Sequence, residues 1–402
     1  MFFYLKALPV QLVLSISAAF LLGTTLDRFN VSIFFTLSHC FVELLLFILP
    51  FMVFSFIFRA LVNLQKGSAR LIVLILAGVM ISNATALIIS FGLSKTLLPL
   101  LNITHVPGFS TELRSTIEPL FSLRLPQLMG TDQAMTLGIL IGLSFNFLSP
   151  ELFLKKRLTH LFTQIGDVVT FFLKFIFIPL LPIYVFGFCL KLSFDRALTH
   201  LFQHYGKVFL LSMSIVIVYL FLLYWIASGF SLRKALRLIK TMLPAGMTGF
   251  STMSSAATMP ITLSCTEKTT QDKNLTQLVI PTTSNIHMLG DDLTIVMTAM
   301  TLLVLFGHPE PSLLQFLLFT CAFCVAKLSC VGIPGASVLV VLPVLQQFLR
   351  FSPEMISVLT TIYILQDPFG TSANVMGNGA FALLIQRTFK SGGKTSSSHS
   401  QG

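Results

Sequence analysis

Residues 250–260 of this chain read FSTMSSAATMP, a run of small hydroxyl residues that lies between two apolar segments and ends in a proline. A segment this polar cannot cross hydrocarbon as an ordinary span, because its hydroxyls and broken backbone would lack hydrogen-bond partners. Its flanks are too apolar for a loop exposed to water. The pattern is typical of a re-entrant hairpin whose tip is buried in protein or lines a wet cavity at membrane depth. A short loop between two ordinary spans is the alternative.

The composition indicates a membrane protein with many spans. Of the 402 residues, 54% are hydrophobic and only 10% are charged, whereas soluble domains carry about 25% charged residues. The net charge of +11 predicts basic cytoplasmic loops, and no nucleic-acid motif accompanies it. The CxxC of Cys321 and Cys324 lacks a second pair of ligands, so we expect neither a metal centre of this kind nor a cofactor.

The apolar runs set the number of spans, each of which needs about 20 residues. Early runs lie near 7–25, 33–60, 69–96, 134–149, 158–190 and 206–230. Later runs, interrupted by Ser, Thr, Gly, Pro and Asp, lie near 275–306, 313–329, 338–349 and 353–386. Together they predict an all-α polytopic membrane protein with eight transmembrane helices and two re-entrant helical hairpins.

The charges between the runs predict the orientation. Basic residues gather at Arg59 to Arg70, at Lys155 to Arg157, at Arg233 to Lys240 and in the tail from Arg387. The connection 307–312 has no Lys or Arg. The positive-inside rule places the four basic clusters and both termini in the cytoplasm and 307–312 outside, in a plasma (inner) membrane. This assignment alternates correctly only if 236–268 enters and leaves from the cytoplasm and 312–350 from outside.

The second hairpin has its own tip, residues 329–337, which read SCVGIPGAS. Its glycines and proline end a helix and let the backbone approach a ligand closely. Two hairpins that are each followed by a polar-interrupted span predict an inverted repeat. Discontinuous helices that meet at mid-membrane are the usual mark of a transporter binding site.

The span after the first hairpin contains PTTSNIHMLGDD at 281–292. Ionisable side chains within a span are costly and usually face a cavity or a partner. His287 and Asp291 are four residues apart, so they share a helix face unless Gly290 unwinds the turn. A proton relay or cation site, to which Asp292 adds a carboxylate, is one interpretation. A pair that satisfies itself in the bundle interior is the other.

A polar stripe at helical spacing follows in the last span and consists of Asp367, Thr371, Asn374 and Asn378. Asp367 has no Lys or Arg near it in the sequence, so its carboxylate favours a cationic partner such as a substrate ammonium. A stripe that only joins helices is the alternative.

These features together resemble the dicarboxylate/amino acid:cation symporters, the glutamate-transporter homologues. SSAATMP at 254–260 is similar to the family's serine-rich first tip with its Thr-Leu-Pro, and GIPG at 332–335 matches the Gly-x-Pro-Gly of the second tip. The eighth-span motif of Asp, Arg-Thr and Asn-Val-x-Gly-Asp keeps Asp367, Thr371, Asn374, Val375 and Gly377. LPIYVF at 181–186 resembles the fifth span.

The chain departs from the family at charged positions. The family's Asn-Met-Asp-Gly-Thr reads HMLGD at 287–291, so the Asp before the glycine is lost and another follows it. Gly370 and Met253 stand where family members place a substrate-binding arginine, and Asn378 replaces the last acid of the eighth-span motif.

The resemblance implies a homotrimeric secondary transporter embedded in lipid. The expected parts are scaffold and trimerisation spans (1–205), a transport core (206–390) and a disordered tail (391–402). The core would comprise hairpin 1 (236–268), an interrupted span (271–306), hairpin 2 (312–350) and the last span (353–390). The expected function is symport of an amino acid or dicarboxylate with Na⁺ and/or H⁺, with neutral amino acids favoured because both arginines are missing. An ion channel of the same fold and an intramembrane hydrolase with a metal on His287 and Asp291 are the alternatives.

The same resemblance assigns the site residues. Substrate contacts fall on Ser254, Ser255, Gly332, Ile333, Pro334, Gly335, Asp367, Gly370, Thr371 and Asn374. Cation coupling, with Na⁺ as the metal, falls on Asn285, His287, Gly290, Asp291, Asn374 and Asn378. Asp367 would hold the substrate ammonium and Asn374 its carboxylate, while the tips add backbone donors and close the site. The lost carboxylates predict fewer coupled sodium ions, with a proton on His287 as a possible partner.

Overall fold

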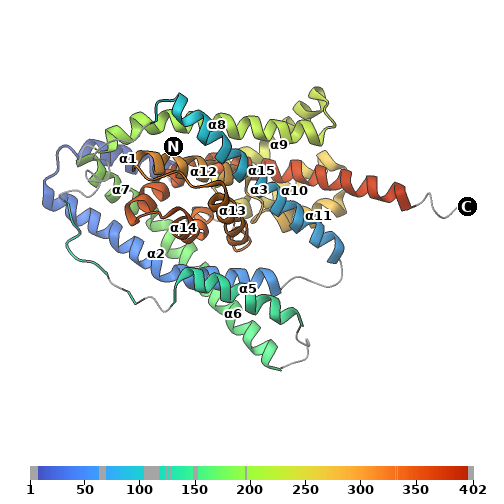
Figure 1. Ribbon diagram of the computed structural model, residues 1–402, viewed down its shortest axis with the longest axis horizontal. Helices are drawn as coiled ribbons and strands as arrows, with labels where there is room; N and C mark the ends of the chain where they lie inside the picture. The colour runs from blue at the N-terminus through green and yellow to red at the C-terminus, as the bar shows by residue number, and fades with distance from the viewer. Residues whose placement is uncertain are drawn as a thin grey trace, which may run out of the picture.

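The computed structural model describes residues 8–62, 69–103, 117–123, 125–126, 129–147, 153–194, 197–330, 332 and 334–396. These residues form helices joined by turns and irregular segments, and there is no strand among them (Figure 1). The predicted all-α class is therefore confirmed.

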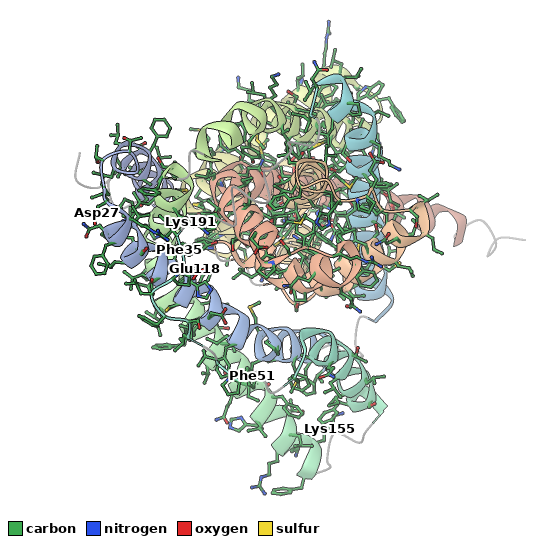
Figure 2. The ribbon with its side chains drawn as sticks, turned by 60° about the vertical axis from the view of Figure 1, so that its left-hand side comes forward. Asp27, Phe35, Phe51, Glu118, Lys155 and Lys191 are labelled. Carbon is green, nitrogen blue, oxygen red and sulfur yellow. The ribbon has the colours of Figure 1, made fainter. Side chains whose placement is uncertain are left out.

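The early helices build an arm. Its elements are α1 (Leu8–Leu22), α2 (Arg28–Val62), α5 (Thr131–Phe147), α6 (Phe153–Phe172), a π-helical turn (Leu173–Phe177) and α7 (Ile178–Phe194). Figure 2 shows the arm extending away from the later helices, from Phe35 through Phe51 to Lys155. Aromatic rings join its helices, since the ring of Phe58 lies 5.2 Å from that of Phe145 and 4.9 Å from that of Phe162.

The later helices form a bundle around α12. Its elements are α3 (Ala69–Leu100), α8 (Ala197–Ala227), α9 (Leu232–Thr252), α10 (Ser255–Thr270), α11 (Lys273–Thr283), α12 (Leu289–Leu305), α13 (Leu313–Lys327), α14 (Ala336–Leu349) and α15 (Pro353–Ser396). Every residue of α12 from Leu289 to Leu303 is buried. A helix buried on all faces is a central element, so the acidic residues of its first turn lie inside the protein.

The interrupted span and the last span differ in detail from the sequence-based prediction. The break lies between α11 and α12, at 284–288, and thus before Gly290 rather than at it. Helix α15 continues to Ser396 and so extends into the segment predicted to be a disordered tail, while 397–402 lie outside the described residues.

Two helical hairpins, α9–α10 and α13–α14, occupy the predicted segments. Helices α10, α13 and α14 have 16, 15 and 14 residues. At 1.5 Å per residue they are about 21–24 Å long, which is less than the ~30 Å of a bilayer core. Each of these three is shorter than that core, whereas α9, the other helix of the first hairpin, has 21 residues and is about 31 Å long.

The hairpins enter the bundle from opposite ends. At the base of the first, Gln386 Nε2 donates to the Thr270 carbonyl oxygen at 2.7 Å. At the other end, Lys95 Nζ lies 3.3 Å from Glu310 Oε2 in the connection that precedes the second hairpin. The bases of the two hairpins thus lie at different ends of the bundle, while their entry from opposite sides of a membrane stays a prediction.

The surface is strongly apolar. Three helical runs of the described residues are long and apolar enough to cross a membrane, namely Leu74–Leu100, Lys155–Lys191 and Tyr205–Ala227. On two of them Ile81, Leu210 and Ile217 are each 67% exposed. Such exposure would be a liability in water and is ordinary against lipid tails.

Candidate substrate and cation site

The tips of the two hairpins meet in the middle of the bundle. Met253 ends α9 in the left-handed region with φ 52°. Ser254 then caps α10, because its Oγ accepts from the Ala257 amide at 3.2 Å. The same hydroxyl donates to the Gly332 carbonyl oxygen at 2.6 Å, and the Ala256 amide donates to that oxygen at 3.3 Å. The tip of the first hairpin therefore binds the tip of the second through two hydrogen bonds to one backbone carbonyl oxygen.

Gly332 is required by this close approach. A Cβ at this position would lie 2.4 Å from Asn285 Oδ1 and 2.8 Å from the Ala256 amide nitrogen. Asn285 comes from the break between α11 and α12, so the tips and the interrupted span converge here. The predicted substrate residue Ser255 is buried in the first turn of α10. Ile333, also predicted, lies outside the described residues.

Asp367 is buried on α15 and faces the second tip. Its Oδ2 accepts from the Gly335 amide at 2.8 Å, and its Oδ1 accepts from Thr371 Oγ1 at 2.9 Å and from the Tyr363 hydroxyl at 3.5 Å. Among the described residues, no basic side chain lies within 4.0 Å of this carboxylate. Asp367, Thr371 and the second tip are thus brought together as predicted, with neutral donors only.

Asn374 joins α15 to the start of α12. Its Oδ1 accepts from the amides of Gly290 at 2.8 Å and Asp291 at 3.4 Å. The first amides of a helix have no partner within it, so Asn374 supplies the acceptor from outside. A Cβ at Gly290 would lie 2.5 Å from the Gly370 carbonyl oxygen, which shows how closely the two helices pack.

Asp291 occupies the space beside position 370. A Cβ on Gly370 would lie 2.4 Å from Asp291 Oδ1, and that oxygen is buried without a hydrogen bond among the described residues. The position that lacks the family's arginine and the position that gains a carboxylate therefore face each other. The sequence showed both departures but not that they touch.

His287 lies in the break, and its partners are not those the sequence suggested. Its Nδ1 is 2.9 Å from Asn378 Oδ1, and its Nε2 is 3.0 Å from Ser82 Oγ. Since α12 begins at Leu289, His287 and Asp291 do not share a helix face. Asp291 faces Gly370 and Lys327 instead. His287 and Asp291 therefore form neither a proton relay with each other nor a hydrogen-bonded pair.

Lys327, the last residue of α13, is the charged residue of the site that sequence reasoning missed. Its Nζ is 3.3 Å from Asp292 Oδ1 and 3.9 Å from Asp291 Oδ2. The available signal was a single lysine within the apolar run 313–329, because an ionisable residue in such a run marks a function or a buried partner. The described residues contain no cluster of three or more His, Cys, Asp and Glu side chains placed to hold a metal.

Comparisons with known proteins bear on the whole chain. The sequence profile of the sodium:dicarboxylate symporter family matches residues 8–388. A serine/threonine transporter, SstT, of Acinetobacter baumannii (strain AYE) is 24% identical over 383 residues, which cover 91% of this chain and 92% of the relative. Similarity to excitatory amino acid transporter 3 of Mus musculus is 28% identity over 150 residues, or 37% of this chain. Similarity to a putative sodium-dependent excitatory amino acid transporter of Caenorhabditis elegans is 25% over 156 residues, or 39% of this chain. These matches span only 28% of the mouse protein and 31% of the nematode protein.

Proposed function

Because the chain belongs to the sodium:dicarboxylate symporter family, we propose that it is a cation-coupled symporter of amino acids that prefers neutral substrates to aspartate, glutamate or succinate. The family consists of transporters, so the chain is a membrane carrier and not an enzyme. Serine and threonine, which name the bacterial relative that matches over most of its length, are the first substrates to test.

The contact between Asp291 and Gly370 carries this proposal. A dicarboxylate in a buried site needs a cationic partner, and a bidentate arginine is the usual one. Here position 370 has no side chain, and the nearest side-chain atom is a carboxylate oxygen. A second acidic group would therefore meet repulsion where the family's arginine would attract it.

Asp367 is proposed to bind the substrate ammonium. It is a buried carboxylate whose neighbours within hydrogen-bond distance are a backbone amide and hydroxyls, so an ammonium would supply the missing positive charge. Asn374, one turn of α15 beyond Thr371, is proposed to bind the substrate carboxylate. The Gly335 amide of the second hairpin donates to the same Asp367 carboxylate. Closure of this hairpin and binding of the substrate ammonium therefore both depend on Asp367.

A proton on His287 is proposed as one coupling ion, with fewer sodium ions than in the glutamate transporters. Both ring nitrogens have partners, Asn378 Oδ1 and Ser82 Oγ, and both of these oxygens can accept a hydrogen bond. The imidazolium, which donates from both nitrogens, is therefore accommodated without rearrangement. The sodium positions that lose carboxylates at Leu289 and Asn378 are proposed to be incomplete.

The arrangement in the membrane belongs to the same proposal. We place eight spans and two re-entrant hairpins in a plasma (inner) membrane with both termini cytoplasmic. Residues 1–205 would form the scaffold of a homotrimer, and 206–390 would move as the transport core. Three of the four hairpin helices, α10, α13 and α14, are shorter than a bilayer core, which supports this arrangement.

Uptake into proteoliposomes tests the function. A panel of radiolabelled amino acids and dicarboxylates is offered under separately imposed Na⁺ and H⁺ gradients. Saturable accumulation of neutral amino acids above equilibrium is expected, whereas flux that only dissipates gradients would indicate a channel. Accumulation is measured as the pH is stepped between about 8 and about 5.5, and His287→Gln should remove the dependence of accumulation on the H⁺ gradient. Preference for aspartate, glutamate or succinate would overturn the substrate class.

A further inference from the structure

A buried cluster of charges joins the second hairpin to the interrupted span. Lys327 is 0% exposed, and its Nζ lies 3.3 Å from Asp292 Oδ1 and 3.9 Å from Asp291 Oδ2. Nζ also donates a hydrogen bond to Ser337 Oγ, so α12, α13 and α14 all contribute to the cluster. The Phe323 ring covers another side, with its centroid 5.3 Å from Nζ.

The cluster requires a positive charge at its centre. Asp291 and Asp292 are 2% and 0% exposed, and ionised carboxylates buried without a partner are strongly unfavourable. They lie in the first turn of α12, where the helix dipole favours negative charge, and Lys327 lies in the last turn of α13, where it favours positive charge. Any cation that filled this space would be held by the same groups.

The oxygen atoms around the ammonium are those that a sodium ion would use, and a sulfur atom, Met288 Sδ, also lies 3.9 Å from Nζ. Two carboxylate oxygens and one hydroxyl oxygen surround Nζ, and hard cations bind through such oxygens. Asp291 Oδ1 remains without a hydrogen bond among the described residues. The cluster thus has the donor chemistry of a cation site, and a side chain of the protein occupies its centre.

Given the transport function proposed above, we infer that the Lys327 ammonium is a tethered cation that replaces one diffusible coupling ion. It arrives at Asp291 and Asp292 with the second hairpin, as a sodium ion would arrive from solution. This position of the carrier therefore takes no Na⁺, and the charge that stabilises the closed second hairpin is always present.

The test measures sodium binding without any substrate. Lys327→Met removes the charge and keeps most of the apolar side chain. Melting temperatures of the purified full-length protein are compared in NaCl and in choline chloride at equal ionic strength. The variant should melt below the native protein in choline and show a sodium-specific rise that exceeds that of the native protein by roughly 2–4 °C. Equal sodium dependence of variant and native protein would overturn the inference.

Matched variants separate a tethered cation from an ordinary structural ion pair. Lys327→Met combined with Asp292→Asn restores the native charge of the cluster and should lose the additional sodium-specific rise, returning to the native sodium dependence. Lys95→Met removes an exposed lysine that pairs with Glu310 and should keep the native sodium dependence. A purely structural pair predicts that Lys327→Met is destabilised equally in both salts.

If Lys327→Met does not fold in choline chloride, the inference is still tested by whether the variant folds in NaCl. Recovery of monodisperse Lys327→Met only when it is purified in NaCl supports the inference, and failure in both salts overturns it. Since no substrate is present, the result does not depend on the uptake assays. A failed amino-acid assay would overturn the proposed function and leave the measured sodium site unaffected.

Discussion

At the scale of the residue, the pair formed by Gly370 and Asp291 decides which substrates fit. Gly370→Arg alone should leave aspartate rejected, because the new guanidinium lies beside Asp291, whose Oδ1 would be 2.4 Å from the new Cβ, and pairs with it. Gly370→Arg with Asp291→Thr should admit aspartate, since it restores the family's two residue types. Hydrogen bonds to charged groups contribute about 1.5–3 kcal/mol, so the ratio of aspartate to serine affinity should rise by ~10–150-fold. Competition binding measures this ratio. Asp291→Thr alone is the control, and equal gains in the single Gly370→Arg variant would contradict the pairing.

Asp367 gives a second prediction at this scale. Asp367→Asn keeps a side chain of similar shape and can still accept a hydrogen bond from the Gly335 amide, but it removes the charge. An ammonium buried without a counter-charge costs about 3–5 kcal/mol, so affinity for amino acids should fall by ~100-fold or more. Isothermal titration of the purified variant checks this, with melting temperature as the control for folding. Undiminished affinity would place the ammonium elsewhere.

The sequence singled out individual residues where one position carries the signal. Asp367, Thr371 and the tip glycines were proposed as site residues because a carboxylate or a glycine in an apolar run is unusual by itself, and the structure brings them together. The partners of His287 and Lys327 were not found, because those contacts join residues far apart in the chain. Asn378 and Ser82 meet His287 from α15 and α3, and Lys327 reaches α12 from the second hairpin. Periodicity within one helix does not contain that information.

At the scale of the element, the contact between the hairpin tips depends on the absence of a side chain at Gly332. Gly332→Ala would place a Cβ 2.8 Å from the Ala256 amide nitrogen, so backbone must move and the bond from Ser254 should be lost. Overpacking of this kind costs about 1–3 kcal/mol, and substrate affinity should fall by ~5–150-fold. Equilibrium binding of labelled substrate measures the loss. Gly206→Ala in α8 is the matched control, because a Cβ there meets nothing within 4 Å. Unchanged affinity in Gly332→Ala would show that the tips need not touch.

The positions of the hairpin helices could be predicted from the polar residues that interrupt the apolar runs. Hairpin 1 was predicted at 236–268 and consists of Leu232–Thr252 and Ser255–Thr270; hairpin 2 was predicted at 312–350 and consists of Leu313–Lys327 and Ala336–Leu349. The position of the break in the interrupted span was less predictable. Gly290 suggested it, but this glycine serves the close packing of α12 against α15, and the helix begins before it.

At the scale of the whole molecule, the proposed topology predicts which side of the membrane each connection faces. In a background without native cysteines, single cysteines at Glu267, Lys273 and Lys394 should react with an impermeant thiol reagent only from the cytoplasm. A cysteine at Glu310 should react only from outside. Labelling of intact cells against inverted vesicles measures this. Outside labelling at Lys273 would make the first hairpin a true span and contradict the inverted repeat.

The buried charges of the core also have an electrical consequence. Asp291, Asp292 and Asp367 carry three negative charges when ionised, and Lys327 balances one of them. If these residues cross the membrane field with the core, the empty carrier moves with two uncompensated negative charges, each worth about 2.3 kcal/mol per 100 mV. An interior-negative membrane voltage would then drive the empty core toward its outward-facing state, which is the state that binds external substrate. A neutral amino acid is a zwitterion and adds no net charge, so two coupling cations would cancel that charge and let the loaded core travel inward with little electrical opposition.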